Sequence, residues 1–222
     1  MPVRKHFLFI CLTFHLLIIY DQFMKYNELS TAIKGPVFSR NDLALAGHKV
    51  LDYQLSLWVK KGYLVRLKNG IYAFSREQEK LQGEGIAFLL YQPSYLSLES
   101  ALSWYGFIPE IVYAYTSVTA RITRTFENAC GRFIYRHVKS ELFWGYVEMK
   151  TDHGPFLLAE PEKALLDYFY LNLARINNED DFENIRLNEE QMEKTLNKDK
   201  FMIYLKAFGG KKMGKWARRC LP

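Results

Sequence analysis

The chain has 222 residues, of which 49% are hydrophobic and 16% aromatic, so it can bury a sizeable core in one large domain or two small ones. Its three cysteines, Cys11, Cys130 and Cys220, are too few and too widely spaced for a disulfide framework or a zinc site, which fits a reducing compartment. The formal net charge of +6 is modest, but it is unevenly distributed.

Basic residues collect in two segments that flank an acidic one. Residues 24 to 75 carry eight basic and three acidic side chains, a net charge of +5. Residues 76 to 205 carry 14 basic and 20 acidic side chains, a net charge of −6, whereas residues 206 to 222 carry six basic and no acidic ones. This distribution predicts at least one polyanionic partner.

The first 23 residues contain an apolar run, Phe7 to Tyr20, behind Arg4 and Lys5. The run is short for a membrane span, and no small-residue cleavage site follows it as in a secretory signal. We expect Met24 to be the natural start, with residues 1–23 upstream of it. An extra hydrophobic helix and a signal or anchor are the alternatives. No stable membrane association is expected, and the expected location is the cytoplasm.

Residues 24 to 75 predict three helices followed by a hairpin. The first helix covers Met24 to Ile33, and Ser39 is a good N-cap for the second, which runs to Ala46. After a turn at Gly47 and His48, the third helix runs from about Lys49 to Lys61. One face of the third helix is apolar, because four residues recur at helical spacing: Leu51, Leu55, Trp58 and Val59.

The hairpin comes directly after the third helix. Alternating residues predict strands at 63–67 and 71–74, and Asn69-Gly70 suits a type I′ turn, whose two central residues both need positive φ. Helix, turn, helix and basic hairpin together predict a winged helix-turn-helix. In that fold the last helix enters the major groove of DNA and the hairpin contacts the backbone. The alternative is that the same fold serves protein contacts.

Eight residues of this segment are candidate DNA contacts. Hydrogen bonds to base edges are expected from Lys49, Tyr53, Gln54 and Ser56, which lie off the predicted apolar face. Phosphate contacts, which position a protein without reading sequence, are expected from Arg40, Lys60, Arg66 and Lys68.

The rest of the chain predicts a larger mixed α/β domain, which makes the expected fold class α+β. Residues 76–93 are expected to form a linking helix that ends at Gln92-Pro93, and residues 94–205 the second domain. Its helices are predicted at 97–105, 160–173, 188–197 and 199–208, its strands at 112–118, 132–138, 146–150 and 156–159, and a polar loop at 177–181.

The chain ends in a basic tail, residues 206–222, which contains Gly209-Gly210. Its charged residues are either a solvated helix face or a second polyanion contact: Lys211, Lys212, Lys215, Arg218 and Arg219. No catalytic site, cofactor or metal is expected, because the five histidines lack metal-ligand spacing. Cys130 and His137 are the one conceivable nucleophile and base, and a small buried cysteine and a solvated strand histidine explain them better.

Three stretches resemble the AbiEi family of antitoxins from type IV toxin–antitoxin systems. They are W-V-K-K-G-Y-L at 58–64 with N-G-I-Y-A-F at 69–74, L-S-L-E-S-A-L-S-W-Y-G-F-I-P-E at 96–110 with Y-T-S-V-T at 115–119, and L-A-E-P-E-K-A-L-L-D at 158–167. The resemblance covers about residues 24 to 205, and the order and spacing of the stretches are more specific than any one of them. Family proteins begin at the first winged-domain helix, so residues 1–23 depart from the pattern.

The resemblance implies a transcriptional autorepressor and antitoxin that serves abortive infection, a form of phage defence. The N-terminal domain would bind operator DNA upstream of its own genes. The C-terminal domain would counter a nucleotidyltransferase-like toxin encoded next door, without a stable complex between the two proteins. The family has no catalytic residue to carry over. The alternative is a solitary winged-helix regulator, or a protein-interaction module, without antitoxin activity.

Overall fold

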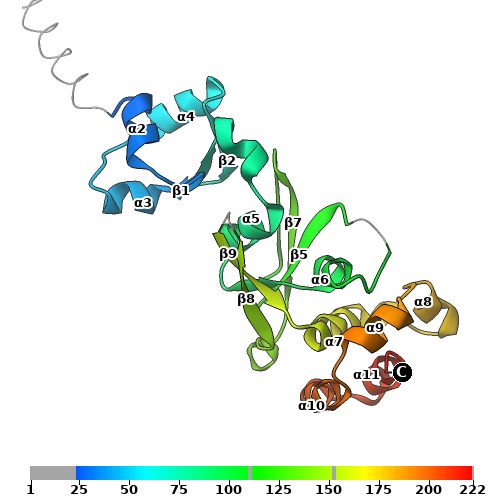
Figure 1. The fold of residues 1–222 in the computed structure, drawn as a ribbon. Helices are drawn as coiled ribbons and strands as arrows, with labels where there is room; N and C mark the ends of the chain where they lie inside the picture. Colours follow the sequence, from blue (N-terminus) through cyan, green and yellow to red (C-terminus); the bar gives the residue numbers. More distant parts are fainter. Residues whose placement is uncertain (1–23, 110–111, 152–153, 222) are drawn as a thin grey trace, which may run out of the picture. The chain divides into compact units, whose positions relative to one another are not determined.

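The structure is a computed structural model that describes residues 24–109, 112–151 and 154–221, and it divides into two compact units after Lys80 (Figure 1). The boundary therefore lies before the break expected near Gln92-Pro93. The reason is helix α5 (Gly83–Leu90), whose Ile86, Ala87 and Leu90 are buried within the second unit. The carbonyl of Ala87 also accepts a hydrogen bond from the Tyr135 hydroxyl of that unit. The predicted linking helix is thus a short 3-10 helix in the first unit and α5 in the second.

The first unit consists of helices on a three-stranded antiparallel sheet. In chain order its elements are α2 (Tyr26–Ala32), β1 (Val37–Ser39), α3 (Arg40–Leu45), α4 (Asp52–Lys60), β2 (Leu64–Lys68), β3 (Ile71–Phe74) and the 3-10 helix η1 (Ser75–Lys80). The strand order is β1-β3-β2. The core contains a buried residue from every helix and strand down to β3: Leu29, Phe38, Leu43, Leu55, Trp58, Leu64, Tyr72 and Phe74.

The hairpin of this unit differs from the predicted type I′ turn. Only Gly70 has a positive φ, of 81°, and the pairing register shifts between Arg66 and Lys68. This β-bulge inserts one extra residue into β2, so Leu64 and Leu67 are both buried although they are three positions apart. Arg66 lies exposed between them, and simple alternation along the strand is lost.

The second unit is built on a six-stranded mixed sheet, and the chain as a whole is α+β (Figure 1). The strands are β4 (Ser94–Leu96), β5 (Ala114–Thr119), β6 (Arg124–Asn128), β7 (Gly131–His137), β8 (Tyr146–Thr151) and β9 (Gly154–Ala159). Their order is β6-β7-β5-β4-β9-β8, with β5 parallel to β7 and β4 parallel to β9.

Helices of this unit are α5, α6 (Leu98–Trp104), α7 (Pro161–Asn172), α8 (Glu179–Glu183), α9 (Glu189–Thr195), α10 (Lys198–Phe208) and α11 (Lys211–Arg218), with 3-10 turns η2 (Ser140–Leu142) and η3 (Leu173–Arg175). The four predicted strands and four predicted helices of residues 94–205 agree with these bounds to within a few residues. Strands β4 and β6 were not predicted. Helix α8 takes the place of much of the polar loop expected at 177–181.

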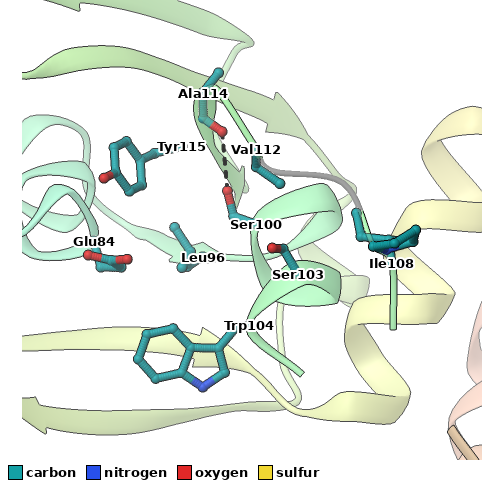
Figure 2. Close-up of a pocket in the computed structure, with 10 residues that line it drawn as sticks. Glu84, Leu96, Ser100, Ser103, Trp104, Ile108, Val112, Ala114 and Tyr115 are labelled. Atoms are coloured by element: carbon teal, nitrogen blue, oxygen red, sulfur yellow. Dashed lines mark hydrogen bonds between the residues drawn. The ribbon is translucent and has the colours of Figure 1, made fainter. Parts of the chain in front are cut away.

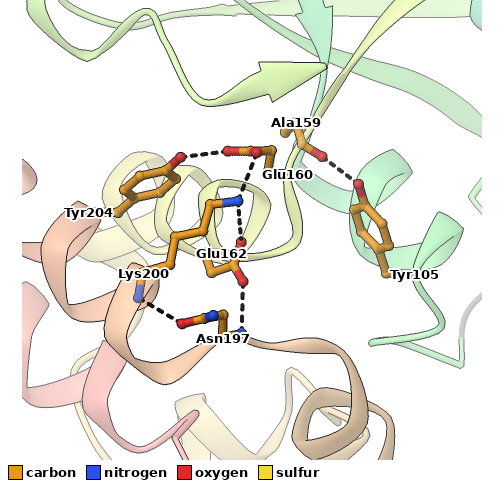
Figure 3. Close-up of polar contacts among 7 residues, drawn as sticks. All are labelled: Tyr105, Ala159, Glu160, Glu162, Asn197, Lys200 and Tyr204. Atoms are coloured by element: carbon orange, nitrogen blue, oxygen red, sulfur yellow. Dashed lines mark hydrogen bonds and ion pairs between the residues drawn. The ribbon is translucent and has the colours of Figure 1, made fainter. Parts of the chain in front are cut away.

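Polar contacts fasten α10 to the start of α7 (Figure 3). The Glu160 carboxylate accepts hydrogen bonds from Lys200 Nζ at 2.8 Å and from the Tyr204 hydroxyl at 2.6 Å. Burial alone would raise the pKa of Glu160, but these two hydrogen bonds together with the charge of Lys200 outweigh it and hold that pKa below its usual value. The Glu162 carboxylate accepts from the Asn197 backbone N–H at 2.8 Å, next to the start of α10.

A buried ion pair joins α7 to β4. Lys163 and Asp167, one helical turn apart on α7, are both fully buried and in direct contact. The Tyr95 hydroxyl accepts from Lys163 Nζ at 2.8 Å and donates to Asp167 at 2.9 Å, and the Ser97 hydroxyl donates to Asp167 at 3.0 Å. Burial lowers the pKa of Lys163 and raises that of Asp167, so each charge depends on the other.

We expect Asp167→Ala to lower the free energy of unfolding of the second unit by about 3–5 kcal/mol, because the substitution leaves the buried Lys163 ammonium without its counter-ion. The matched control is Glu190→Ala, which breaks the exposed Glu190–Lys194 pair at the same helical spacing and should cost at most about 1 kcal/mol. Urea denaturation followed by circular dichroism measures both. Equal losses for the two variants would show that the buried pair has no special role.

Candidate nucleic-acid interface

Helices α3 and α4 are joined by a turn that Gly47 makes possible. Ser39 caps α3: its hydroxyl accepts from the Asp42 N–H at 3.1 Å, and the Asp42 carboxylate accepts from the Ser39 N–H at 2.6 Å. This capping box satisfies two backbone donors and confirms the predicted start of the helix. Gly47 has a φ of 75°, a left-handed conformation that favours glycine, and the chain turns there out of α3.

Helix α4 begins at Asp52, three residues after the predicted start at Lys49. Its N-cap is Leu51, whose backbone is extended and whose N–H donates to the Gln54 side chain at 3.0 Å. Lys49 is therefore exposed but lies before the helix, so its expected position on the DNA-reading face is wrong. Leu51 was expected on the apolar face and is instead 40% exposed, whereas Leu55 and Trp58 are buried as predicted.

Three of the candidate residues form one exposed stripe on α4. Tyr53, Ser56 and Lys60 are all exposed and follow one another at spacings of three and four residues. That spacing places them on one side of a helix, opposite the buried Leu55 and Trp58. Tyr53, with 73% of its surface exposed, is the most prominent side chain of the stripe. The stripe combines hydroxyl donors and acceptors with a cation.

Gln54 is not free to read bases, contrary to the prediction. Its side-chain carbonyl accepts from Leu51 N–H, and its amino group donates to the Met24 carbonyl at 2.9 Å. Both polar atoms thus hold the start of α4 against the residue that precedes α2. The residue type at the third helical position was the signal for this role, because glutamine there commonly closes a cap.

The predicted phosphate contacts differ in their surroundings. Arg40, at the start of α3, forms an exposed ion pair of 2.6 Å with Asp52 at the start of α4. Arg66, on β2, donates to the Asn69 side chain at 2.8 Å and is otherwise exposed. Lys68 lies at the end of β2 and is partly buried. Asp52 and Asn69, which were not expected to contact these side chains, therefore orient Arg40 and Arg66.

The basic tail is a packed helix of the second unit and not a separate extension. Met213, Trp216 and Ala217 of α11 are buried, and the Trp216 ring stacks on Phe182 of α8 with centroids 5.5 Å apart. Of the five proposed cations, Lys215 and Arg219 pair with Glu179, and Lys212 donates to Asn177 at 3.1 Å. Lys211 and Arg218 line a shallow pocket of about 390 Å³.

The remaining candidates are not brought together. Cys130 precedes β7 and His137 ends it, which separates them by about 20 Å at the usual rise of a strand. Burial raises the pKa of the Cys130 thiol, so it is a poorer nucleophile than a free cysteine. Among the residues that the structure describes, no three of His, Cys, Asp or Glu are grouped to hold a metal ion. No helix within the described ranges is long and apolar enough to span a membrane.

We expect Gln54→Ala to lower the free energy of unfolding of the first unit by about 1 kcal/mol, as for a lost helix cap. The same substitution should leave unchanged the ratio of affinities for different DNA sequences, because Gln54 is committed to Leu51 and Met24. Thermal unfolding and competition binding measure the two effects. A changed sequence preference without loss of stability would return Gln54 to the base-reading set.

The first unit thus presents one polar stripe on α4, an arginine on α3 that pairs with the start of α4, and a second exposed arginine on the hairpin. No protein-family model matches the chain, and a search of curated proteins finds no significant similarity.

Proposed function

We propose that the first unit is a winged helix-turn-helix domain that binds operator DNA, and that the protein represses its own operon in the cytoplasm. The observation that carries this proposal is the exposed stripe of Tyr53, Ser56 and Lys60 on α4. The order of the elements supports it, because three helices precede an antiparallel hairpin and α4 follows α3 after a short turn. A net charge of +5 over residues 24 to 75 favours binding to a polyanion.

The side chains divide into two roles. Tyr53 and Ser56 would contact base edges by hydrogen bonds. Lys60 and Arg66 would contact phosphates on either side of the groove, and Lys49 would do so from the segment before α4. Arg40 would join them when its exposed pair with Asp52 opens, since exposed ion pairs contribute at most about 1 kcal/mol.

The second unit would supply the antitoxin activity. The support is the resemblance of residues 96–119 and 158–167 to AbiEi antitoxins. Residues 158–167 include Lys163 and Asp167, so part of the resemblance lies in the buried pair that holds this unit together. The countered protein would be a nucleotidyltransferase-like toxin encoded beside this gene.

A second candidate function is a protein-interaction module. It is favoured by a shallow pocket of about 350 Å³ beside α4, lined largely by apolar groups of Met24, Tyr26, Leu51 and Leu57. Leu51 and Tyr53 are exposed at its rim, and exposed apolar surface of this kind suits a protein partner as well as the methyl group of thymine. DNA binding decides between the two.

We expect Tyr53→Ala and Ser56→Ala each to weaken binding to the upstream region of the gene by about 1–3 kcal/mol, with a much smaller effect on unrelated DNA. Lys60→Ala and Arg66→Ala should weaken binding to every sequence, and each should reduce the salt slope of log K by about 1, because each removes one phosphate contact. Lys150→Ala, an exposed lysine on β8, is the control for loss of one charge. Fluorescence anisotropy over a range of salt concentrations measures the wild type and the five variants. If the wild type shows no preference for its upstream region, the repressor proposal fails.

The two proposed activities should be separable. We expect the Lys60→Ala/Arg66→Ala double variant to lose repression of its promoter and still protect cells that express the neighbouring nucleotidyltransferase-like protein, because both substitutions lie in the first unit. A promoter–reporter assay and a growth assay measure the two outcomes. The antitoxin proposal fails if the folded wild type gives no protection, or if no such gene adjoins this one; the protein is then a solitary regulator.

A further inference from the structure

A pocket of the second unit has the chemistry of a cation site. It has a volume of about 470 Å³ and opens between α5, α6 and β5 (Figure 2). Its polar and aromatic lining comes from all three elements: Glu84 from α5, Ser103 and Trp104 from α6, and Tyr115 from β5. None of the described residues that line it is basic. Neither the DNA-binding stripe nor the buried ion pair of α7 includes a residue of this pocket.

Trp104 and Tyr115 are held in place by neighbouring rings. The Trp104 indole is 45% exposed and meets the Phe156 ring edge-on, with centroids 5.7 Å apart. Tyr115 stacks on Phe133, with centroids 5.3 Å apart and planes 16° apart. Both rings are therefore fixed before a ligand arrives, and Figure 2 shows them on different walls of the same space. Fixed aromatic walls reduce the ordering cost of binding.

Gly83 lets Tyr115 lie against α5. A Cβ atom at this position would lie 1.8 Å from Tyr115 Cζ, so any other residue would push the ring away. The contact places Glu84, the next residue of α5, beside the phenol. Burial, followed by the charge of Glu84, raises the pKa of Tyr115, so its hydroxyl keeps its proton at neutral pH.

The Glu84 carboxylate is the one acidic group among the described residues that line the pocket, and the structure records no hydrogen bond or ion pair for it. It is partly buried, so water and salt screen it less than an exposed carboxylate. The Ser100 hydroxyl already accepts from the Thr116 N–H at 2.8 Å and donates to the Ala114 carbonyl at 3.3 Å. No hydrogen bond is recorded for the Ser103 hydroxyl. The unfilled acceptors of the pocket are therefore a carboxylate and a hydroxyl.

We propose that this pocket binds the guanidinium group of an arginine that a protein partner presents. A guanidinium is planar, so it can stack on the Trp104 indole while its N–H groups donate to Glu84 and Ser103. A phosphate or carboxylate ligand would be repelled by Glu84. The described lining carries one acidic and no basic side chain, which favours the approach of a cation. The proposal is independent of DNA binding by the first unit.

The test is a titration of the full ¹⁵N-labelled chain with the blocked tripeptide acetyl-Gly-Arg-Gly-amide, followed through the amide signals of Ser103 and Ala114. We expect saturable shifts, and binding at least about tenfold weaker for the citrulline peptide, which has the same shape without the charge. The lysine peptide should also bind less tightly, because an ammonium cannot stack. Free arginine should bind more weakly than the blocked peptide, because its own carboxylate is repelled by Glu84.

Two variants complete the test. Glu84→Gln should weaken binding of the arginine peptide about tenfold, because it removes one charge-assisted hydrogen bond. Glu148→Gln makes the same change of charge at an exposed position on β8, and it should weaken binding by less than about twofold. The amide spectrum itself reports that each variant is folded. Absence of saturable shifts, equal binding of the citrulline or lysine peptide, or equal effects of the two variants would overturn the guanidinium site. Tighter binding of free arginine would overturn the protein partner in favour of a small-molecule ligand.

Discussion

The Lys163–Asp167 pair is the contact on which the second unit depends. Moving a charged group from water into the protein interior costs several kcal/mol of hydration free energy. A buried charge is therefore tolerated only when partners in fixed positions compensate for that loss. The partners here come from several elements. Tyr95 and Ser97 belong to β4 and the turn after it, while the rings of Trp144, before β8, and Phe208, at the end of α10, lie within 5.3 Å of Lys163 Nζ. One lysine therefore sets the positions of strand β4, helices α7 and α10, and the chain between η2 and β8.

The same pair determines how α6 begins. Ser97 donates to Asp167, and the next residue, Leu98, has a positive φ of 57°, which costs a non-glycine residue about 1–2 kcal/mol. The conformation persists because Leu98 is fully buried and because Ser97 is also held by Thr116 on β5, through its N–H at 3.1 Å and its carbonyl at 2.8 Å. Helix α6 then carries Ser103 and Trp104 to the pocket. The positions of Ser103 and Trp104 in the pocket thus depend on the buried Lys163–Asp167 pair, through Ser97.

The sequence predicted the elements whose pattern is periodic and whose ends carry chemical signals. Ser39 and Gly47 marked a helix start and a turn correctly, and apolar periodicity located α7 and α10. Strand β4 was not predicted because all three of its residues are buried, so its sequence shows no alternation. Strand β6 was not predicted because its residues are largely polar. The bulge at Leu67 and the late start of α4 depend on hydrogen bonds of particular atoms, which a residue pattern does not specify.

The least predictable feature was the buried lysine. Lys163–Asp167 and Glu190–Lys194 have the same spacing and the same residue chemistry, yet one pair is fully buried and the other is exposed. The order of the charges is reversed, and the residues around Lys163 are more apolar than those around Glu190, but the spacing of the charges does not separate the two pairs. The difference arises from what packs over each helix, and here the aromatic residues of distant segments, Tyr95, Trp144 and Phe208, supply the cover.

Charge is distributed differently in the two units, because residues 24 to 80 carry a net charge of +5, whereas acidic and basic side chains balance over residues 81 to 222. The basic residues of α4 and the hairpin face solvent with few acidic neighbours, so their field acts outward, whereas two of the cations of α11 face Glu179. In the second unit the Glu84 carboxylate, for which no hydrogen bond or ion pair is recorded, lies in a pocket with the rings of Trp104 and Tyr115. An anion such as DNA and a cation such as arginine would therefore be bound by different units, and the binding of one need not displace the other.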